Sequence, residues 1–226
     1  MVASRAPDTD VRLAALAAAM RLFAAHGFEG TALQDIADTV GVSKQAILHH
    51  FPSKEHVRQA VLDVILSHWN EALPRLLLAA TAGDDRFDAV FGETCRFFAA
   101  DPDRARMLMR EALDRPAEVR KLLRGSVRPW FAAVAGYIRS GKQKGLHYAT
   151  VDEEAYVVHI LLLVLAAAAA APLASAALDG ADARPRFERE LARIAHASLF
   201  PPPSLPPAAP TPDAARAVAR RRKSPR

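Results

Sequence analysis

The chain has 226 residues, of which 51% are apolar and 24% are charged, and it contains a single cysteine, Cys95. This composition excludes a wholly disordered protein, a disulfide framework and a cysteine-rich zinc site. The formal net charge of +5 equals the charge of residues 201–226 alone, which hold six basic residues and one acidic residue, so charge by itself does not predict nucleic-acid binding.

Apolar residues near the start of the chain recur with the spacing of a helix. Leu16, Met20 and Phe23 are three or four residues apart, and Gly27 is expected to end that helix. With 48 alanines and 24 arginines, both strong helix formers, the whole chain is predicted to be all-α. Residues 1–10 lack a basic segment followed by an apolar one, so we expect no secretion and a cytoplasmic location.

Residues 31–58 predict two short helices joined by a tight turn. Thr31 with Gln34 is a capping box that would open the first helix, and Gly41 supplies the backbone freedom that the turn needs. Ser43 can cap the second helix, which Pro52 then ends. This arrangement is typical of a helix-turn-helix, whose second helix lies in the major groove of DNA.

The rest of the chain is predicted to be helical up to residue 200. From Ile160 to Leu178 nineteen residues carry no charge, close to the roughly 20 that span a bilayer. More than half of them are alanine or serine, which gain little from lipid, so we expect no membrane span and a buried helix–helix interface. Pairing of helices within 153–178 and 184–200 between two subunits would then form a homodimer.

Residues 201–226 differ in composition from everything before them. Seven prolines within 201–212 prevent a continuous helix, and the last residues are basic, so we predict a disordered tail. Its basic end either contacts DNA phosphates or only increases solubility.

Several short motifs give the chain a resemblance to the tetracycline-repressor (TetR) family. They are Leu22-Phe23, Gly27-Phe28, Asp35-Ile36-Ala37, Gly41-Val42-Ser43-Lys44 and His50-Phe51-Pro52-Ser53-Lys54-Glu55. The resemblance implies a DNA-binding domain over residues 9–69 with its motif at 32–51, and a ligand-binding and dimerisation domain over 70–200. One departure is Leu48-His49, where the family usually has an aromatic pair, so no tyrosine is available there to contact phosphate.

The family resemblance also implies a function and DNA-binding residues. It implies a homodimeric transcriptional regulator, most simply a repressor, which a small apolar or aromatic effector releases from a two-fold symmetric site on double-stranded DNA. By position, Lys44, Gln45 and His49 would face the groove, with Gln45 reading adenine, while His50, Lys54, Thr31 and Ser43 would contact phosphates. The alternatives are that both lysines are solvated surface residues and that His50 braces Phe51.

The effector site is harder to predict, because aromatic side chains line cores as well as pockets. Eight side chains are candidates for the pocket wall, with ordinary core packing as the alternative: Trp69, Phe91, Cys95, Met107, Trp130, Tyr137, Tyr156 and His159. We find no motif for a nucleophile elbow, a phosphate-binding loop or a zinc site, so we expect no enzyme, metal or cofactor. The remaining alternatives are a helical interaction protein without a regulatory role or, less favoured, an enzyme on a helical scaffold.

Overall fold

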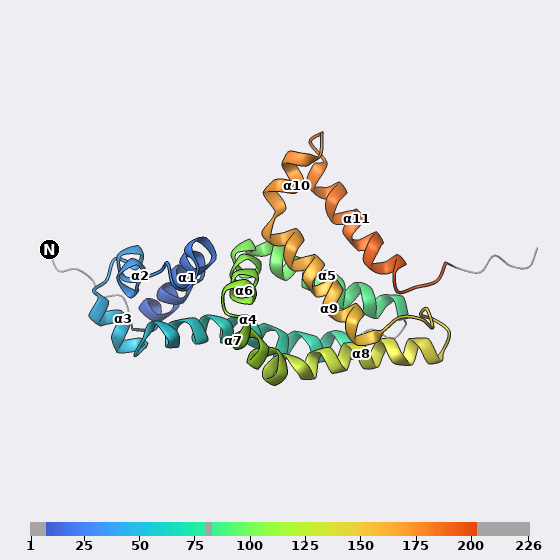
Figure 1. The fold of residues 1–226 in the computed structure, drawn as a ribbon, viewed down its shortest axis with the longest axis horizontal. Coiled ribbons are helices and arrows are strands. Elements are labelled where there is room, and N and C mark those ends of the chain that lie inside the picture. The colour runs from blue at the N-terminus through green and yellow to red at the C-terminus, as the bar shows by residue number, and fades with distance from the viewer. Residues whose placement is uncertain (1–7, 80–82, 203–226) are drawn as a thin grey trace, which may run out of the picture.

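A computed structural model of the protein describes residues 8–79 and 83–202 (Figure 1). Within these ranges every regular element is helical, which confirms the all-α prediction. Residues 203–226, almost all of the predicted tail, lie outside the described residues. The elements are α1 (Asp8–His26), α2 (Leu33–Val40), α3 (Lys44–His50), α4 (Lys54–Ala79), α5 (Gly83–Ala100), α6 (Pro102–Asp114), α7 (Pro116–Leu122), the π-helical turn η1 (Leu123–Val127), α8 (Arg128–Gln143), α9 (Glu153–Ala169), α10 (Ala171–Ala177) and α11 (Ala183–Ala197).

Helices α1 to α3 and the first turns of α4 form the N-terminal head, at the left in Figure 1. Leu16, Met20 and Phe23 are buried, as their spacing predicts, and α1 contacts α2, α3 and α4. Gly27 ends α1 with a φ of +75°, in the left-handed region that glycine adopts without strain. Gly41 has a φ of +78° between α2 and α3, so the predicted helix-turn-helix is present.

The start of α2 differs from the predicted capping box. The N–H of Ala32 donates to Asp35 Oδ2 at 2.7 Å, so the carboxylate of Asp35 closes the end of the helix. Thr31 lies one residue before this cap, and its Oγ1 donates to the Gly27 carbonyl oxygen at 2.9 Å. The prediction of a Thr31–Gln34 box was wrong, because α2 begins one residue later than the pattern suggested.

Helix α4 runs without interruption from the head into the body, which comprises α5 to α11 (Figure 1). It passes through residues 69 and 70, where we placed the domain boundary, so the two parts share one helix. Helix α6 packs on α1 of the head and on α9 of the body. Movement of α4 or α6 relative to the rest of the body would therefore change how the head is held.

The long apolar segment forms two helices instead of one. Helix α9 ends at Ala169, and α10 begins at Ala171 with Pro172 in its first turn. Proline is compatible with the start of a helix but not with its interior, which explains the break. Among the described residues no helix is long and apolar enough to cross a membrane.

A buried contact between α8 and the loop that follows it gives a test of the packing of the body. A Cβ at Gly141 would lie 2.1 Å from ring atoms of His147, whose Nδ1 donates to the Ile138 carbonyl oxygen at 2.9 Å. Because that ring is buried and held, we expect Gly141→Ala to lower the free energy of unfolding by about 1–3 kcal/mol. Gly136→Ala, in the same helix but facing open space, should instead stabilise by about 0.5–1 kcal/mol. Urea unfolding measures both, and equal effects would contradict the packing.

Candidate nucleic-acid interface and internal cavity

Helix α3 presents a polar face to solvent because its opposite face is anchored in the head. Ile47 is fully buried against the core, whereas Lys44, Gln45 and His49 are exposed. Gln45 and His49 are four residues apart and therefore lie on the same side of the helix. Ser43 Oγ accepts from the Ala46 N–H at 3.2 Å, so the predicted cap is present and its side chain is also exposed. The structure thus brings four of the seven predicted DNA-binding residues to one exposed surface.

The other three predicted residues are placed differently. Thr31 is 1% exposed, with its hydroxyl donating to the Gly27 carbonyl oxygen at 2.9 Å, so its side chain is not presented to solvent, and a phosphate contact there would have to use backbone N–H groups. Lys54 Nζ donates to the Phe28 carbonyl oxygen at 2.8 Å and lies 4.3 Å from the centre of its ring, so this ammonium braces the head. His50 is half-buried, with its ring 6.3 Å from that of Phe51.

The body contains a partly open cavity of about 530 Å³ with walls from α4 to α9. This volume is in the range of small-molecule sites. Five of the eight predicted wall residues line it: Trp69, Phe91, Trp130, Tyr137 and Tyr156. Trp130 Nε1 donates to Asn70 Oδ1 at 3.1 Å, and Tyr156 Oη donates to the Ala195 carbonyl oxygen at 2.6 Å. Burial raises the pKa of the Tyr156 hydroxyl, so it stays a neutral donor.

The remaining three predicted wall residues do not line the cavity. Met107 is packed in the core, and His159 lies exposed on the outer face of α9. Cys95 is half-buried away from the cavity, and burial raises the pKa of its thiol to about 11, so the thiolate is scarce at neutral pH. A helical spacing identifies an inward face but does not tell which inward residues meet empty space, and this explains Met107 and Cys95. His159 failed for another reason, since it does not lie on the inward face at all.

Sequence reasoning also missed most of the wall that α4 contributes. This wall repeats every three or four residues over five turns, at Arg58, Leu62, Leu66, Trp69, Leu73 and Leu77. The spacing was visible in the sequence and is the signal that could have found it. Glu111, on α6, was missed as well, and no spacing rule links it to Arg58.

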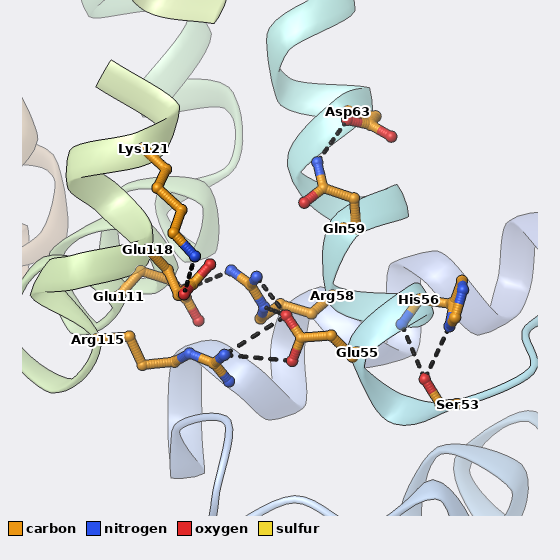
Figure 2. A network of polar contacts seen from close by, with 10 residues as sticks. All are labelled: Ser53, Glu55, His56, Arg58, Gln59, Asp63, Glu111, Arg115, Glu118 and Lys121. Carbon is orange, nitrogen blue, oxygen red and sulfur yellow. Dashed lines mark hydrogen bonds and ion pairs between the residues drawn. The ribbon is translucent and has the colours of Figure 1, made fainter. Parts of the chain in front are cut away.

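Arg58 and Glu111 form a buried ion pair at the end of the cavity nearest the head (Figure 2). Arg58 Nη1 donates to Glu111 Oε2 at 2.8 Å, and the two side chains are only 4% and 5% exposed. Arg58 Nε also donates to Glu55 Oε1 at 2.8 Å, and Nη2 makes a second contact with the same carboxylate. Burial raises the pKa of the Glu111 carboxyl, although Arg58 opposes that effect.

The same charged cluster holds the head against the body. The guanidinium of Arg115, at the end of α6, lies 3.3 Å from Glu55 Oε2 and 4.2 Å from the centre of the Phe28 ring. Arg110 Nε donates to the Ala24 carbonyl oxygen at 2.8 Å, and its Nη2 donates to that of Ala25 at 2.8 Å. The C-terminal end of α6 therefore holds the end of α1 through hydrogen bonds to its carbonyl oxygens, and it contacts the following turn at the ring of Phe28.

Comparison with known proteins gives a family for the N-terminal part of the chain. The sequence profile described as "Bacterial regulatory proteins, tetR family" matches residues 15–61. The chain is 34% identical over 135 residues to the HTH-type transcriptional regulator RutR of Escherichia coli (strain K12). That alignment covers 57% of this chain and 62% of RutR, so the chain spans less than two thirds of this relative.

Solved structures share the fold over nearly the whole chain. The ketosteroid transcriptional regulator KstR2 of Mycobacterium tuberculosis superposes with a TM-score of 0.67 at 16% identity, covering 89% of this chain and 98% of that one. The fatty acid degradation regulator FadR from Bacillus halodurans superposes with a TM-score of 0.62 at 18% identity, covering 83% and 96%. The all-α arrangement of a helix-turn-helix head and a helical body is therefore that of known regulators.

Proposed function

Because the chain belongs to the tetR family of bacterial regulatory proteins, we propose that it is a DNA-binding transcriptional regulator, most simply a repressor. In this proposal it binds double-stranded operator DNA in the cytoplasm as a homodimer and acts by binding rather than by catalysis. The observation that carries the proposal is the exposed polar face of α3, with Lys44, Gln45 and His49 on a helix anchored by Ile47. Such a face suits the major groove, where side-chain amides read base edges.

A homodimer is supported by an apolar surface on the outer face of α9 and α11. Leu163 of α9 is 38% exposed and does not line the cavity, and Ile194 of α11 is 43% exposed. Val158 and Leu162 of α9 are 39% and 47% exposed and also form part of the cavity wall. Exposed apolar surface of this kind is typical of an interface between subunits. A two-fold axis that brings α9 and α11 of two subunits together would cover it with a four-helix contact. The same axis would place two α3 helices on the two halves of a symmetric operator.

We propose that the cavity of the body binds a small apolar or aromatic effector, and that its occupation releases the DNA. The wall is made mainly of aliphatic and aromatic side chains. An apolar ligand that covers them removes their surface from water, which lowers the free energy of the complex. The cavity also adjoins α4 and α6, the two helices that connect the body with the head. The structural neighbours named for ketosteroids and for fatty acid degradation guide the choice of probes.

Gel-shift assays with the DNA upstream of the protein's own gene test the proposal through α3. We expect Lys44→Ala to weaken binding to all sequences and to reduce the salt dependence, because a phosphate contact releases counterions. We expect Gln45→Ala to cost about 1–3 kcal/mol on the operator and much less on unrelated DNA, because it removes base readout. Lys144→Ala, an exposed lysine at the far end of α8, is the matched control. Equal losses in all three variants would contradict the assignment of α3.

A further inference from the structure

The cavity has charged side chains at one end, and the rest of its wall is mainly apolar. Its wall follows α4 from Arg58 to Leu77, which is about 28 Å of helix at about 1.5 Å per residue. The end next to the head carries the Arg58–Glu111 pair, and the wall between the ends is mainly aliphatic and aromatic. The other cations of the wall are Arg86, near the start of α5, and Lys121 of α7, which is 76% exposed and paired with Glu118. This shape suits an elongated apolar molecule with one polar end.

Arg58 is the buried cation that such a polar end would meet. Its guanidinium has five N–H donors, and the hydrogen bonds to Glu55 and Glu111 use three of them. The planar group can bind a carboxylate through two parallel hydrogen bonds. A carboxylate bound there would escape the large cost of burying an unpaired charge. An uncharged polar end would gain much less at this place.

We propose that the effector is an elongated apolar molecule ending in a carboxylate, and that this carboxylate binds Arg58 in place of Glu111. The inference rests on the proposed function, since it specifies the effector class of that regulator. Glu111 is the partner that can be displaced, because it accepts one hydrogen bond from Arg58, whereas Glu55 accepts two. Burial, which raises the pKa of the Glu111 carboxyl, also weakens its hold as a charged partner.

The displaced carboxylate has a second cation within reach. Arg115 follows Glu111 by four residues at the end of α6, and its charge already acts on the Glu111 carboxyl. In the free protein Arg115 contacts Glu55 and lies over the ring of Phe28 (Figure 2 shows its contact with Glu55). If Arg115 turns toward Glu111, the head loses one of the side chains that hold Phe28. The charge of the effector, and not only its bulk, then loosens the attachment of the head.

Two matched probes, dodecanoate and 1-dodecanol, test the proposal on the full chain. They share one alkyl chain and differ in the charged end. The chain has two tryptophans, Trp69 and Trp130, and both line the cavity, so intrinsic fluorescence reports binding without a label. At pH 8 we expect dodecanoate to bind about tenfold more tightly than the alcohol. Because a carboxylate is far harder to dehydrate, tighter or equal binding of the alcohol would overturn the proposal.

Two variants change the preference in opposite directions if the proposal is right. Glu111→Gln removes the competing charge and should tighten dodecanoate binding severalfold while leaving 1-dodecanol unchanged. The double variant Arg58→Met with Glu111→Met replaces the pair with apolar side chains of similar size, which folded proteins often tolerate. It should keep the alcohol and lose the preference for the acid. A preference that survives in the double variant, or that is lost in Arg86→Gln or Lys121→Gln instead, would overturn the assignment to Arg58.

The binding assay contains no DNA, so failure of this inference is distinguishable from failure of the proposed function. A protein that prefers dodecanoate but never shifts DNA would refute the regulator and leave the carboxylate site standing. A protein that shifts operator DNA but shows no acid preference would refute the carboxylate site alone. If both hold, dodecanoate should release the operator at concentrations where 1-dodecanol does not, and the double variant should abolish that difference.

Discussion

Replacement of Leu163 by glutamate is expected to give monomers and to lower operator affinity by a factor of about 10²–10⁴. Leu163 lies on the exposed outer face of α9 and does not line the cavity, so the change acts on the proposed interface without altering the effector site. A charge there would have to be buried without a partner in the dimer, which is costly. The affinity falls because a monomer engages one half of the operator at a time.

Sedimentation and gel-shift assays measure the two consequences separately. Leu113→Glu is the matched control, because Leu113 is an exposed leucine of α6 and lies outside the proposed interface. We expect that variant to keep the mass of a dimer. A Leu163→Glu protein that still sediments as a dimer would refute the interface on α9 and α11. A monomer with undiminished operator affinity would instead refute the need for two heads.

Glu111→Ala is expected to lower the free energy of unfolding by about 3 kcal/mol, because it leaves the guanidinium of Arg58 buried with one partner fewer. Both side chains of the pair are almost completely inaccessible to water in the wild type, at 4% and 5% exposed. The effect should be at the lower end of the range for broken buried pairs, since Glu55 continues to hold Arg58. Denaturant unfolding followed by circular dichroism measures it.

Two variants show whether the loss comes from the unpaired charge. Replacing the pair together, as Arg58→Met with Glu111→Met, should recover most of the stability, because no charge is left alone. Glu118→Ala removes a carboxylate whose partner, Lys121, is largely exposed, and we expect the melting temperature to stay near that of the wild type. A double variant as unstable as Glu111→Ala would mean that lost packing, and not charge, is responsible.

The helices and the helix-turn-helix followed from the sequence because their causes are local. Leu16, Met20 and Phe23 are buried since a stripe at helical spacing has one way to avoid water. Gly41 adopts the left-handed conformation that the turn requires, and Ser43 caps the next helix as expected. The cap predicted for α2 was wrong because the Thr31 hydroxyl donates to the Gly27 carbonyl oxygen instead of capping the helix, and Asp35 accepts from the N–H of Ala32.

The sequence by itself determined the helical segments, the exposed face of α3 and the apolar character of the later helices. Only the tertiary structure decided where the cavity lies, because Trp69 and Met107 follow similar helical patterns, yet one meets empty space and the other meets packed side chains. It also decided the charged end of that cavity. Arg58 and Glu111 are 53 residues apart, and no local rule reports a contact that arises when α4 and α6 pack together. Long-range pairing depends on the whole fold, and for that reason the contacts that join the cavity wall to the head could be read only from the structure.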